Sequence, residues 1–319
     1  VKDNRTSTPY KQLRSIDKST LPDENPTREI TLNLTGDMER YIWSINGETL
    51  AKDNTIRIRH GENVRFVLVN KTMMHHPMHL HGHFFRMLNG QGNYSPLKHT
   101  IDVPPLATRI IEFEANEYND WFFHCHILYH AKSGMARIVS YEDKELDMDL
   151  QKIRPKLYKD TWYPKIIATA QSHMTDGIVA LGNSKNILST TWQVGWQRID
   201  ETDYDIEQAY DHYFNRFLNV FTGLNITNKY KRGILGIRYL LPFNFESALR
   251  ADSEGELRIE LAQALQLTSR FGIFGTAEYD TETKKEWLLG GKYTLSKNTA
   301  LMGQYHSDFG MGAGIEIRF

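Results

Sequence analysis

The sequence is poor in cysteine, in net charge and in long apolar runs, and each shortage excludes a class of protein. A single cysteine, Cys125, stands among 319 residues, so no internal disulfide can hold the fold together. The 38 basic and 39 acidic side chains nearly balance, which leaves no basic footprint for nucleic acid. No stretch approaches the ~18 apolar residues of a membrane helix. A β-barrel span remains possible, because its signal is alternation of polar and apolar residues.

The amino terminus lacks the pattern of an export signal. The sequence opens on Val1, and no positively charged start is followed by an apolar core. Because a signal peptide would need both features, we expect a mature or truncated chain. Its length is enough for two domains of ordinary size, each with its own core.

The first half of the chain consists of short β-branched and aromatic runs separated by Gly, Asn and Pro. Examples up to about Val139 are EITLNL, TRIIEFEA and DWFFHCH. This texture is typical of a β-sandwich. Between Tyr141 and Lys185 the sequence becomes charged and loses its periodicity. We interpret that segment as a linker with about one helical turn.

The second half is dominated by clean alternation of apolar and polar residues. In LRIELAQALQL, residues 257–267, most odd positions carry Leu or Ile, whereas the even positions include Arg and Glu. Such a strand has one apolar face and one polar face. Roughly ten segments of this kind predict an up-and-down antiparallel barrel, which closes without leaving a sheet edge.

Alternation alone leaves open which face of the barrel points inward. A soluble lipocalin-like barrel would bury the apolar set, whereas an outer-membrane barrel would turn it toward lipid and fill its lumen with charged residues. Three features favour the membrane barrel. The strands are near the ~9–11 residues of a tilted span, Trp and Tyr occur near strand ends, and the final residue, Phe319, is in phase with the apolar set.

Two segments of the first half are rich in metal-ligand side chains. HPMHLHGH and HCHILYHAKSGM supply His76, His79, His81, His83, His124, Cys125, His126, His130 and Met135. A thiolate, two imidazoles and a weak thioether are the ligand set of a blue-copper site. The equal spacing of Cys125, His130 and Met135 suits one loop that closes around a metal, with a distant histidine completing the set.

The remaining histidines of these segments suggest a second site beside the first. Residues i and i+2 of an extended segment share a face, so His124 and His126 should point together, and so should His79 and His81. Paired imidazoles of this kind suit a copper-rich site. Cys125 would then be joined through the backbone to ligands of both sites.

Zinc is the rival metal, because Cys and His bind it well. A structural zinc site, however, needs four ligands rather than eight and would hardly use Met. Histidines outside the two segments are interpreted as ordinary core or surface residues, among them His60, His173, His212 and His306.

These motifs resemble those of a known family. HPMHLHGH and HCHILYHAKSGM match the last two copper motifs of multicopper oxidases. Residues 28–141 look like the C-terminal cupredoxin domain of the copper-resistance protein A branch, through phrases such as LTGDMERYIWSING and KHTIDVPP. From about Trp162 onward the chain is similar to copper-resistance protein B, an outer-membrane barrel, through GILGIRYLLPFNFESALRADSEGELRIE.

The resemblance implies a fold and a set of ligands. The expected fold is all-β, with an extension over residues 1–27, a cupredoxin Greek-key β-sandwich over 28–141, a linker over 142–186 and an outer-membrane-type antiparallel β-barrel of about 8–10 strands over 187–319. Type 1 copper would be held by His76, Cys125, His130 and Met135. Type 2 copper would be held by His79, and the type 3 pair by His81, His124 and His126.

The implied activity is that of a multicopper oxidase in copper resistance. Type 1 copper would take electrons from Cu(I) or an organic donor, with His76, Cys125 and His130 as the catalytic residues. The type 2/type 3 cluster would then reduce O2 to water. The even strand number of a membrane barrel would place the cupredoxin domain in the periplasm of a Gram-negative cell.

One departure from the family pattern keeps other functions open. A complete oxidase has two further His-x-His motifs in an N-terminal cupredoxin domain, and no histidine precedes Arg28 here. The missing half of the trinuclear site would come from upstream domains or from another subunit of a homo-oligomer. The alternatives are a non-enzymatic copper-binding protein tethered to the outer membrane, and a barrel whose own task is copper sequestration or passage.

Overall fold

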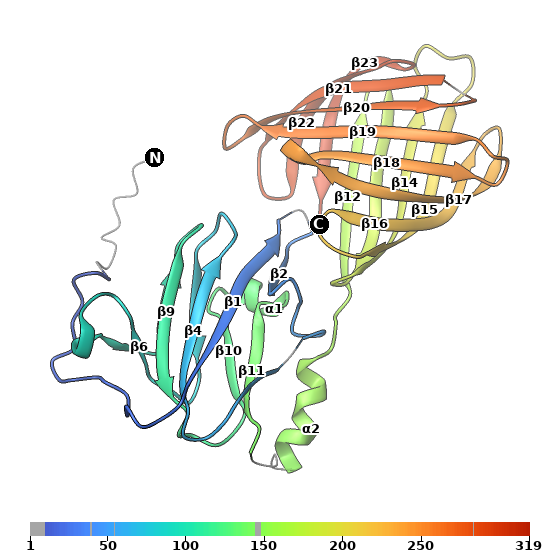
Figure 1. The fold of residues 1–319 in the computed structure, drawn as a ribbon. Coiled ribbons are helices and arrows are strands. Elements are labelled where there is room, and N and C mark those ends of the chain that lie inside the picture. Colours follow the sequence, from blue (N-terminus) through green and yellow to red (C-terminus); the bar gives the residue numbers. More distant parts are fainter. Residues whose placement is uncertain (1–9, 39, 54, 144–147, 283) are drawn as a thin grey trace. The chain divides into compact units, whose positions relative to one another are not determined.

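A computed structural model describes residues 10–38, 40–53, 55–143, 148–282 and 284–319. The chain divides into two compact units, Val1–Asp160 and Thr161–Phe319. Strands are the main regular structure of both units, which confirms the predicted all-β fold. Figure 1 shows layered sheets in the first unit and a closed barrel in the second.

The first unit contains a β-sandwich of two sheets. The six-stranded sheet has the order β2-β1-β4-β9-β6-β7, and the five-stranded sheet has the order β3-β11-β10-β5-β8. The strands of the first sheet are β1 (Thr27–Asp37), β2 (Ile42–Ile45), β4 (Asn63–Asn70), β6 (Phe85–Met87), β7 (Leu97–Lys98) and β9 (Thr108–Glu114). Those of the second are β3 (Thr55–Ile58), β5 (His76–Leu80), β8 (Thr100–Val103), β10 (Trp121–Cys125) and β11 (Ala136–Tyr141).

The sandwich core follows from the alternation within each strand. In β4, Val64, Phe66 and Leu68 are fully buried, while the residues between them are partly exposed. Phe66 of the first sheet meets Phe123 of the second at a centroid distance of 5.3 Å. Burying each such side chain stabilises the fold by about 1.5–3 kcal/mol, so this shared core holds the two sheets together.

Helical structure is sparse in the described part of the chain. It comprises α1 (Leu128–Lys132), α2 (Met148–Leu157), η1 (Gly92–Tyr94) and η2 (Pro242–Asn244). The first follows β10 directly and carries His130. The second lies within the segment predicted as a linker. Among the described helices, none has both the length and the apolar character that crossing a membrane requires.

The second unit is a closed antiparallel barrel of consecutive strands. They are β12 (Tyr163–Gln171), β13 (Met174–Gly182), β14 (Asn186–Gly195), β15 (Asp203–Tyr213), β16 (Leu218–Thr227), β17 (Lys231–Leu241), β18 (Phe245–Asp252), β19 (Leu257–Gln266), β20 (Phe271–Asp280), β21 (Lys284–Thr294), β22 (Thr299–His306) and β23 (Gly310–Arg318). The last strand pairs with the first, at Ile167 and Arg318 among others.

The barrel has more strands than the sequence predicted. Twelve strands close it, against about 8–10 expected, and β12 and β13 arise from residues that were assigned to the linker over 142–186. The sequence did not predict these two strands because their apolar and polar residues alternate only weakly. Both Ile167 and Ile178 lie on the same face of the sheet as the polar side chains of Thr169 and Asp176, which hydrogen-bond to each other. The barrel therefore begins at Tyr163 rather than near residue 187.

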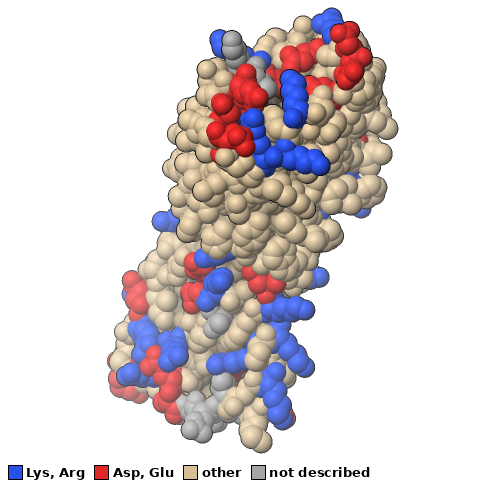
Figure 2. Space-filling model, turned by 90° about the vertical axis from the view of Figure 1, so that its right-hand side faces the viewer, with Lys and Arg blue, Asp and Glu red and all other residues tan. Residues whose placement is uncertain are grey.

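The apolar face of the barrel points outward. Leu257 and Ile259 of β19 are 47% and 54% exposed, whereas Arg258 between them extends into the lumen. Leu235 and Leu289 are exposed in the same way on other strands. Figure 2 shows a broad band without charged side chains across the barrel. This orientation is the reverse of a lipocalin-like barrel and is the one expected of an outer-membrane barrel.

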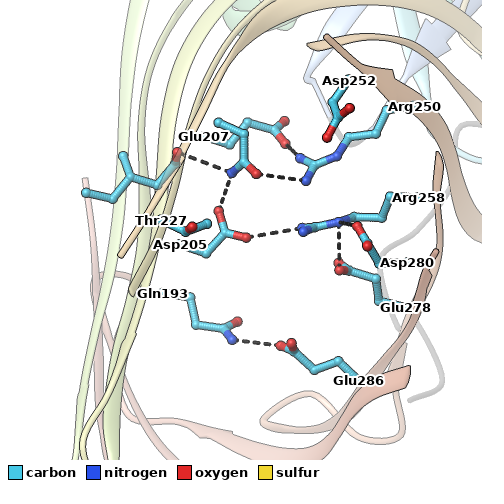
Figure 3. A network of polar contacts seen from close by, with 12 residues as sticks. Gln193, Asp205, Glu207, Thr227, Arg250, Asp252, Arg258, Glu278, Asp280 and Glu286 are labelled. Carbon is cyan, nitrogen blue, oxygen red and sulfur yellow. Dashed lines mark hydrogen bonds and ion pairs between the residues drawn. The ribbon is translucent and has the colours of Figure 1, made fainter. Parts of the chain in front are cut away.

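Charged side chains cross the barrel lumen and pair with one another (Figure 3). Arg258 forms ion pairs with Asp205 at 3.1 Å, Glu278 at 2.9 Å and Asp280 at 3.0 Å. Arg250 pairs with Glu207 on the facing wall. Charged pairs thus connect facing walls of the barrel across its lumen.

Candidate metal centre

Two neighbouring strands of the second sheet carry most of the predicted ligands. In β5 and β10, which pair antiparallel, His79 lies opposite His124 and Met78 opposite Cys125. Because successive strand residues point to opposite faces, His76 and Cys125 turn toward the sandwich core, where both are fully buried. The same alternation turns His79 and His124 to the other face. The sheet therefore separates the predicted ligands into two groups, one on each side.

The first group brings together His76, Cys125 and His130. The Nδ1 atoms of His76 and His130 are 3.1 Å apart, and the Cys125 Sγ lies 3.8 Å and 3.7 Å from them. All three side chains are fully buried. Donors that each lie about 2.0–2.3 Å from one ion are about 3–4 Å from each other. The geometry of the three donors therefore fits a single metal ion.

The hydrogen-bond network around His76 prepares its Nδ1 for a metal. The Thr72 hydroxyl lies 2.8 Å from the Asn70 Oδ1 and donates to it, so the Thr72 oxygen accepts from the His76 Nε2 at 2.7 Å. With the proton on Nε2, the Nδ1 presents a lone pair to the site. A second group that fixes the tautomer of a ligand in this way is a regular feature of metal sites.

Burial keeps the first group uncharged when no metal is bound. Desolvation lowers the pKa of His76 to about 3 and that of His130 to about 4. It also raises the pKa of the Cys125 thiol to about 11. The imidazoles are therefore ready to coordinate at neutral pH, whereas the thiol must release its proton to the solvent as a metal binds.

Met135 lies next to this group in the backbone. Its amide donates to the His130 carbonyl at 2.9 Å, and its carbonyl accepts from the Cys125 amide at 3.1 Å. The Met135 side chain is fully buried. The loop that follows β10 therefore folds back on itself and brings the Met135 backbone beside those of Cys125 and His130.

Trp43 is a neighbour of the first group that the sequence analysis missed. Its fully buried ring stacks on His130 with centroids 4.0 Å apart and meets His76 edge-on at 5.2 Å. In the sequence, Trp43 is only a single Trp within YIWSI. Nothing in that stretch indicates a contact with the histidines. The contact holds both imidazoles in place from the side of β2.

The second group brings together the ring nitrogens of His79, His81 and His124, which all lie within 4.8 Å of one another. The His124 Nδ1 donates to the Cys125 carbonyl at 2.9 Å, which leaves its Nε2 as a lone pair 3.2 Å from the His81 Nε2. Burial lowers the pKa of both His81 and His124. The close approach of these ring nitrogens suits them to bind a shared cation.

His126 and His99 lie at the margin of the second group. The exposed ring of His126 lies with its centroid 5.7 Å from that of His79. His126 therefore does not belong to the second group of His79, His81 and His124, although the sequence predicted it as a ligand. His99, which was not predicted, accepts a hydrogen bond from the His79 Nδ1 through its carbonyl at 2.7 Å. This bond leaves the His79 Nε2 free. His83 instead bonds to the buried Tyr141 hydroxyl at 2.8 Å.

The first unit is similar in sequence to known proteins. Residues 23–145 match the family model described as multicopper oxidase. Copper resistance protein A of Pseudomonas syringae pv. tomato is 44% identical over 129 residues, which are 40% of this chain and 21% of that protein. Copper resistance protein A of Escherichia coli is 43% identical over 118 residues, or 37% of this chain and 20% of that protein.

Two further matches are less similar in sequence. Multicopper oxidase MmcO of Mycobacterium tuberculosis is 37% identical over 116 residues, covering 36% of this chain and 23% of that protein. The solved McoA multicopper oxidase of Aquifex aeolicus is 26% identical, with a TM-score of 0.33, over 39% of this chain and 31% of that one. The chain spans about a fifth of the length of the curated relatives named here. Residues 23–145 thus match the multicopper oxidase family model, the chain is similar to copper resistance protein A over part of its length, and the same chain carries a twelve-stranded β-barrel.

Proposed function

We propose that this chain is the dioxygen-reducing end of a copper-resistance oxidase, anchored in the outer membrane by its barrel. In this proposal His76, Cys125, His130 and Met135 hold type 1 copper, His79 holds type 2 copper, and His81, His124 and His126 belong to the type 3 pair. Copper so placed supplies one-electron oxidation of Cu(I) or an organic donor and the reduction of O2 to water.

The observation that carries the proposal is the approach of two buried imidazole nitrogens and one buried thiol. The two Nδ1 atoms are 3.1 Å apart, and burial keeps both imidazoles in the neutral form at pH 7. Apolar surroundings exclude water, and the stacked Trp43 orients the rings. An all-His site would bind copper without an intense visible band, whereas a thiolate with two imidazoles produces the strongly coloured blue-copper site.

A short bonded path joins the two groups of ligands. Cys125 and His124 are consecutive, and the Nδ1 of His124 also bonds to the Cys125 carbonyl at 2.9 Å. Their side chains leave the strand on opposite faces, one toward each group. This connection supports transfer of electrons between the two groups without a mobile carrier.

Copper loading tests the assignment of the first group. We expect the full chain in detergent to gain an intense visible band on addition of Cu(II), because a copper-bound thiolate absorbs through charge transfer. Cys125→Ser should remove the band, and His306→Gln in the barrel should leave it unchanged. A copper-loaded protein without colour would exclude type 1 copper.

The barrel supports the membrane part of the proposal. Its outward leucines are 40–65% exposed at Leu235, Leu261 and Leu289, an apolar surface that lipid would cover. Phe214, Phe217 and Phe243 are exposed at turns of one end, where an interfacial aromatic girdle would lie. An even number of strands would place both barrel termini on the periplasmic side, together with the oxidase domain.

Membrane insertion has its own test. The chain should be extracted from membranes only with detergent, and its unheated form should migrate faster on a gel than its boiled form. Full solubility in plain buffer, without any shift on heating, would reject the outer-membrane location. It would leave the copper assignment untouched.

A non-enzymatic copper binder is the second candidate. All histidines of the second group come from one domain, and His81 and His126 are exposed. A closed oxygen-reducing cluster would need further ligands that shield these two side chains from solvent. In that case the chain sequesters or relays copper. Measurement of oxygen uptake separates the two candidates.

A further inference from the structure

The barrel has a small pocket at the end where β12 begins and β23 ends. The turn over residues 214–217 and helix η2 meet there, because β16 and β17 pair antiparallel from Leu218 opposite Tyr239. The pocket has a volume of about 240 Å³ and is lined among others by Phe217, Tyr239, Leu240, Leu241 and Phe243. Pockets for drug-sized ligands span ~300–1,000 Å³. This pocket therefore has room for only a part of a larger, mainly apolar molecule.

Phe243 lines the pocket in a backbone conformation that bulky residues rarely adopt. Its φ is 62°, and that of the following Asn244 is 59°, which is the left-handed region. The Gln263 side-chain amide of β19 donates to the Phe243 carbonyl at 2.9 Å and supports this turn. The Phe243 ring is 86% exposed. Because strained residues of this kind cluster at ligand-binding sites, the turn is a candidate for contact with a ligand.

A cation lies directly beside the pocket. Arg216 is exposed in the turn over residues 214–217, and its guanidinium carbon is 4.8 Å from the centroid of the Phe217 ring. The face of an aromatic ring attracts a guanidinium and so helps to orient it. An arginine held in this way can donate two parallel hydrogen bonds to a phosphate group. The pocket thus combines apolar walls with one phosphate-binding side chain.

The charges of the short turns differ between the two ends of the barrel. The described turns at the pocket end contain no acidic residue, and their basic residues are Lys185, Arg216, Arg270 and Lys297. At the other end Arg198 and Lys229 are outnumbered by Asp200, Glu201, Glu254, Glu256, Glu282 and Asp308. An anionic partner is therefore favoured at the pocket end and disfavoured at the opposite end.

We propose that this pocket and Arg216 bind one anionic phospholipid molecule of the surrounding membrane. The guanidinium donates to the lipid phosphate, and the upper part of an acyl chain lies against Phe217, Tyr239 and Phe243. Aromatic girdles are general in membrane barrels, but a cavity next to an oriented cation is specific to this place on the barrel. The inference rests on the proposed membrane location and goes beyond it by assigning a class of lipid to one site.

Native mass spectrometry of the full chain in detergent tests the site. Phosphatidylglycerol is titrated against phosphatidylcholine, whose phosphate is neutralised by its own headgroup. We expect one phosphatidylglycerol per chain to bind about tenfold more tightly than phosphatidylcholine, because its contact with Arg216 is charge-assisted. Arg216→Gln should remove this preference. Lys297→Gln, which removes a charge from another turn of the same end that does not line the pocket, should keep it.

A second variant tests the apolar part of the site. Phe243→Gly removes the ring and suits the left-handed backbone, so its barrel should fold. It should weaken the binding of both lipids by about tenfold. Heat-modifiable gel migration shows which variants have folded, and if Arg216→Gln does not fold, Phe243→Gly decides.

Two results would overturn the lipid site. One is equal binding of both lipids by the unchanged chain. The other is an equal loss in Arg216→Gln and Lys297→Gln, which would show only a general attraction of anionic lipid to basic turns. Full solubility in plain buffer would instead reject the membrane location itself. A barrel that needs detergent but has no lipid preference rejects the site alone, so the two failures are distinguishable.

Discussion

The Nδ1 atoms of His76 and His130 lie 3.1 Å apart, although 54 residues separate them in the chain. Strand β5 delivers the first and helix α1, just after β10, delivers the second. The Thr72 hydroxyl fixes the tautomer of His76, and Trp43 packs against both rings. The fold therefore brings these proposed ligands together by itself, and we expect copper uptake to require little rearrangement.

Removing the hydroxyl that bonds to His76 should weaken copper binding. Thr72→Val keeps the shape of the side chain but frees the His76 Nε2, and loss of such an outer hydrogen bond typically lowers metal affinity by about 10–100-fold. Copper affinity would be measured by competition with a chelator. Thr31→Val, at an exposed position of β1, is the control. Equal affinity for both variants would show that the bond to Thr72 does not orient the ligand.

Met135→Leu should leave the visible band in place and raise the reduction potential of the copper. An axial thioether is a long and weak ligand whose loss favours the reduced state, while the thiolate and the imidazoles that produce the colour remain. Spectra and redox titration of the loaded protein check both expectations. Disappearance of the colour would mean that Met135 is more than an axial ligand.

Gly36→Ala should disturb the copper site from a distance. A Cβ at Gly36 would lie 2.4 Å from the Trp43 ring, so this ring, which stacks on His130, must shift. We expect a loss of about 1–3 kcal/mol in the free energy of unfolding and a shift of the visible band. Gly233→Ala, where a Cβ meets no atom within 4 Å, is the control. Thermal unfolding and the absorption spectrum give the result, and an unchanged band would separate Trp43 from the site.

The chain alone should show little oxidase turnover, because one domain supplies only half of the histidines of a trinuclear cluster. Oxygen uptake by the copper-loaded protein, fractionated by size, tests this. Rapid uptake by a monomer would show that the cluster is complete without a partner. Uptake confined to an oligomer would indicate that subunits share the site.

Arg258→Ala should destabilise the barrel strongly. The guanidinium pairs with Asp205, Glu278 and Asp280, and its removal leaves these carboxylates without their shared counter-charge. Breaking a buried ion pair in this way costs about 3–5 kcal/mol. The temperature at which gel migration changes measures the effect. Arg270→Ala, at an exposed turn, should leave that temperature unchanged, and an equal change in both variants would contradict a role for the lumen network.

Some features of the fold and the site could be predicted, and others could not, for identifiable reasons. Cys125 and His130 lie five residues apart, so their joint site was visible from spacing. Their approach to His76 followed from motif resemblance, and that of Trp43 was missed because it depends on contact between distant strands. Strands β12 and β13 were missed because an isoleucine on each inner face weakens the alternation that marks a barrel strand.

The sequence by itself determined the ligand types, their spacing and the two-faced character of the strands, because these are local properties of residue chemistry and of a repeat of two. The tertiary structure decided which histidines face one another, since that depends on the register of β5 with β10. It also decided that the barrel turns its leucines outward, because alternation is the same for either orientation and only closure of the sheet selects one. The pocket beside Phe217 and Phe243 likewise exists only once β16, β17 and β18 are brought together.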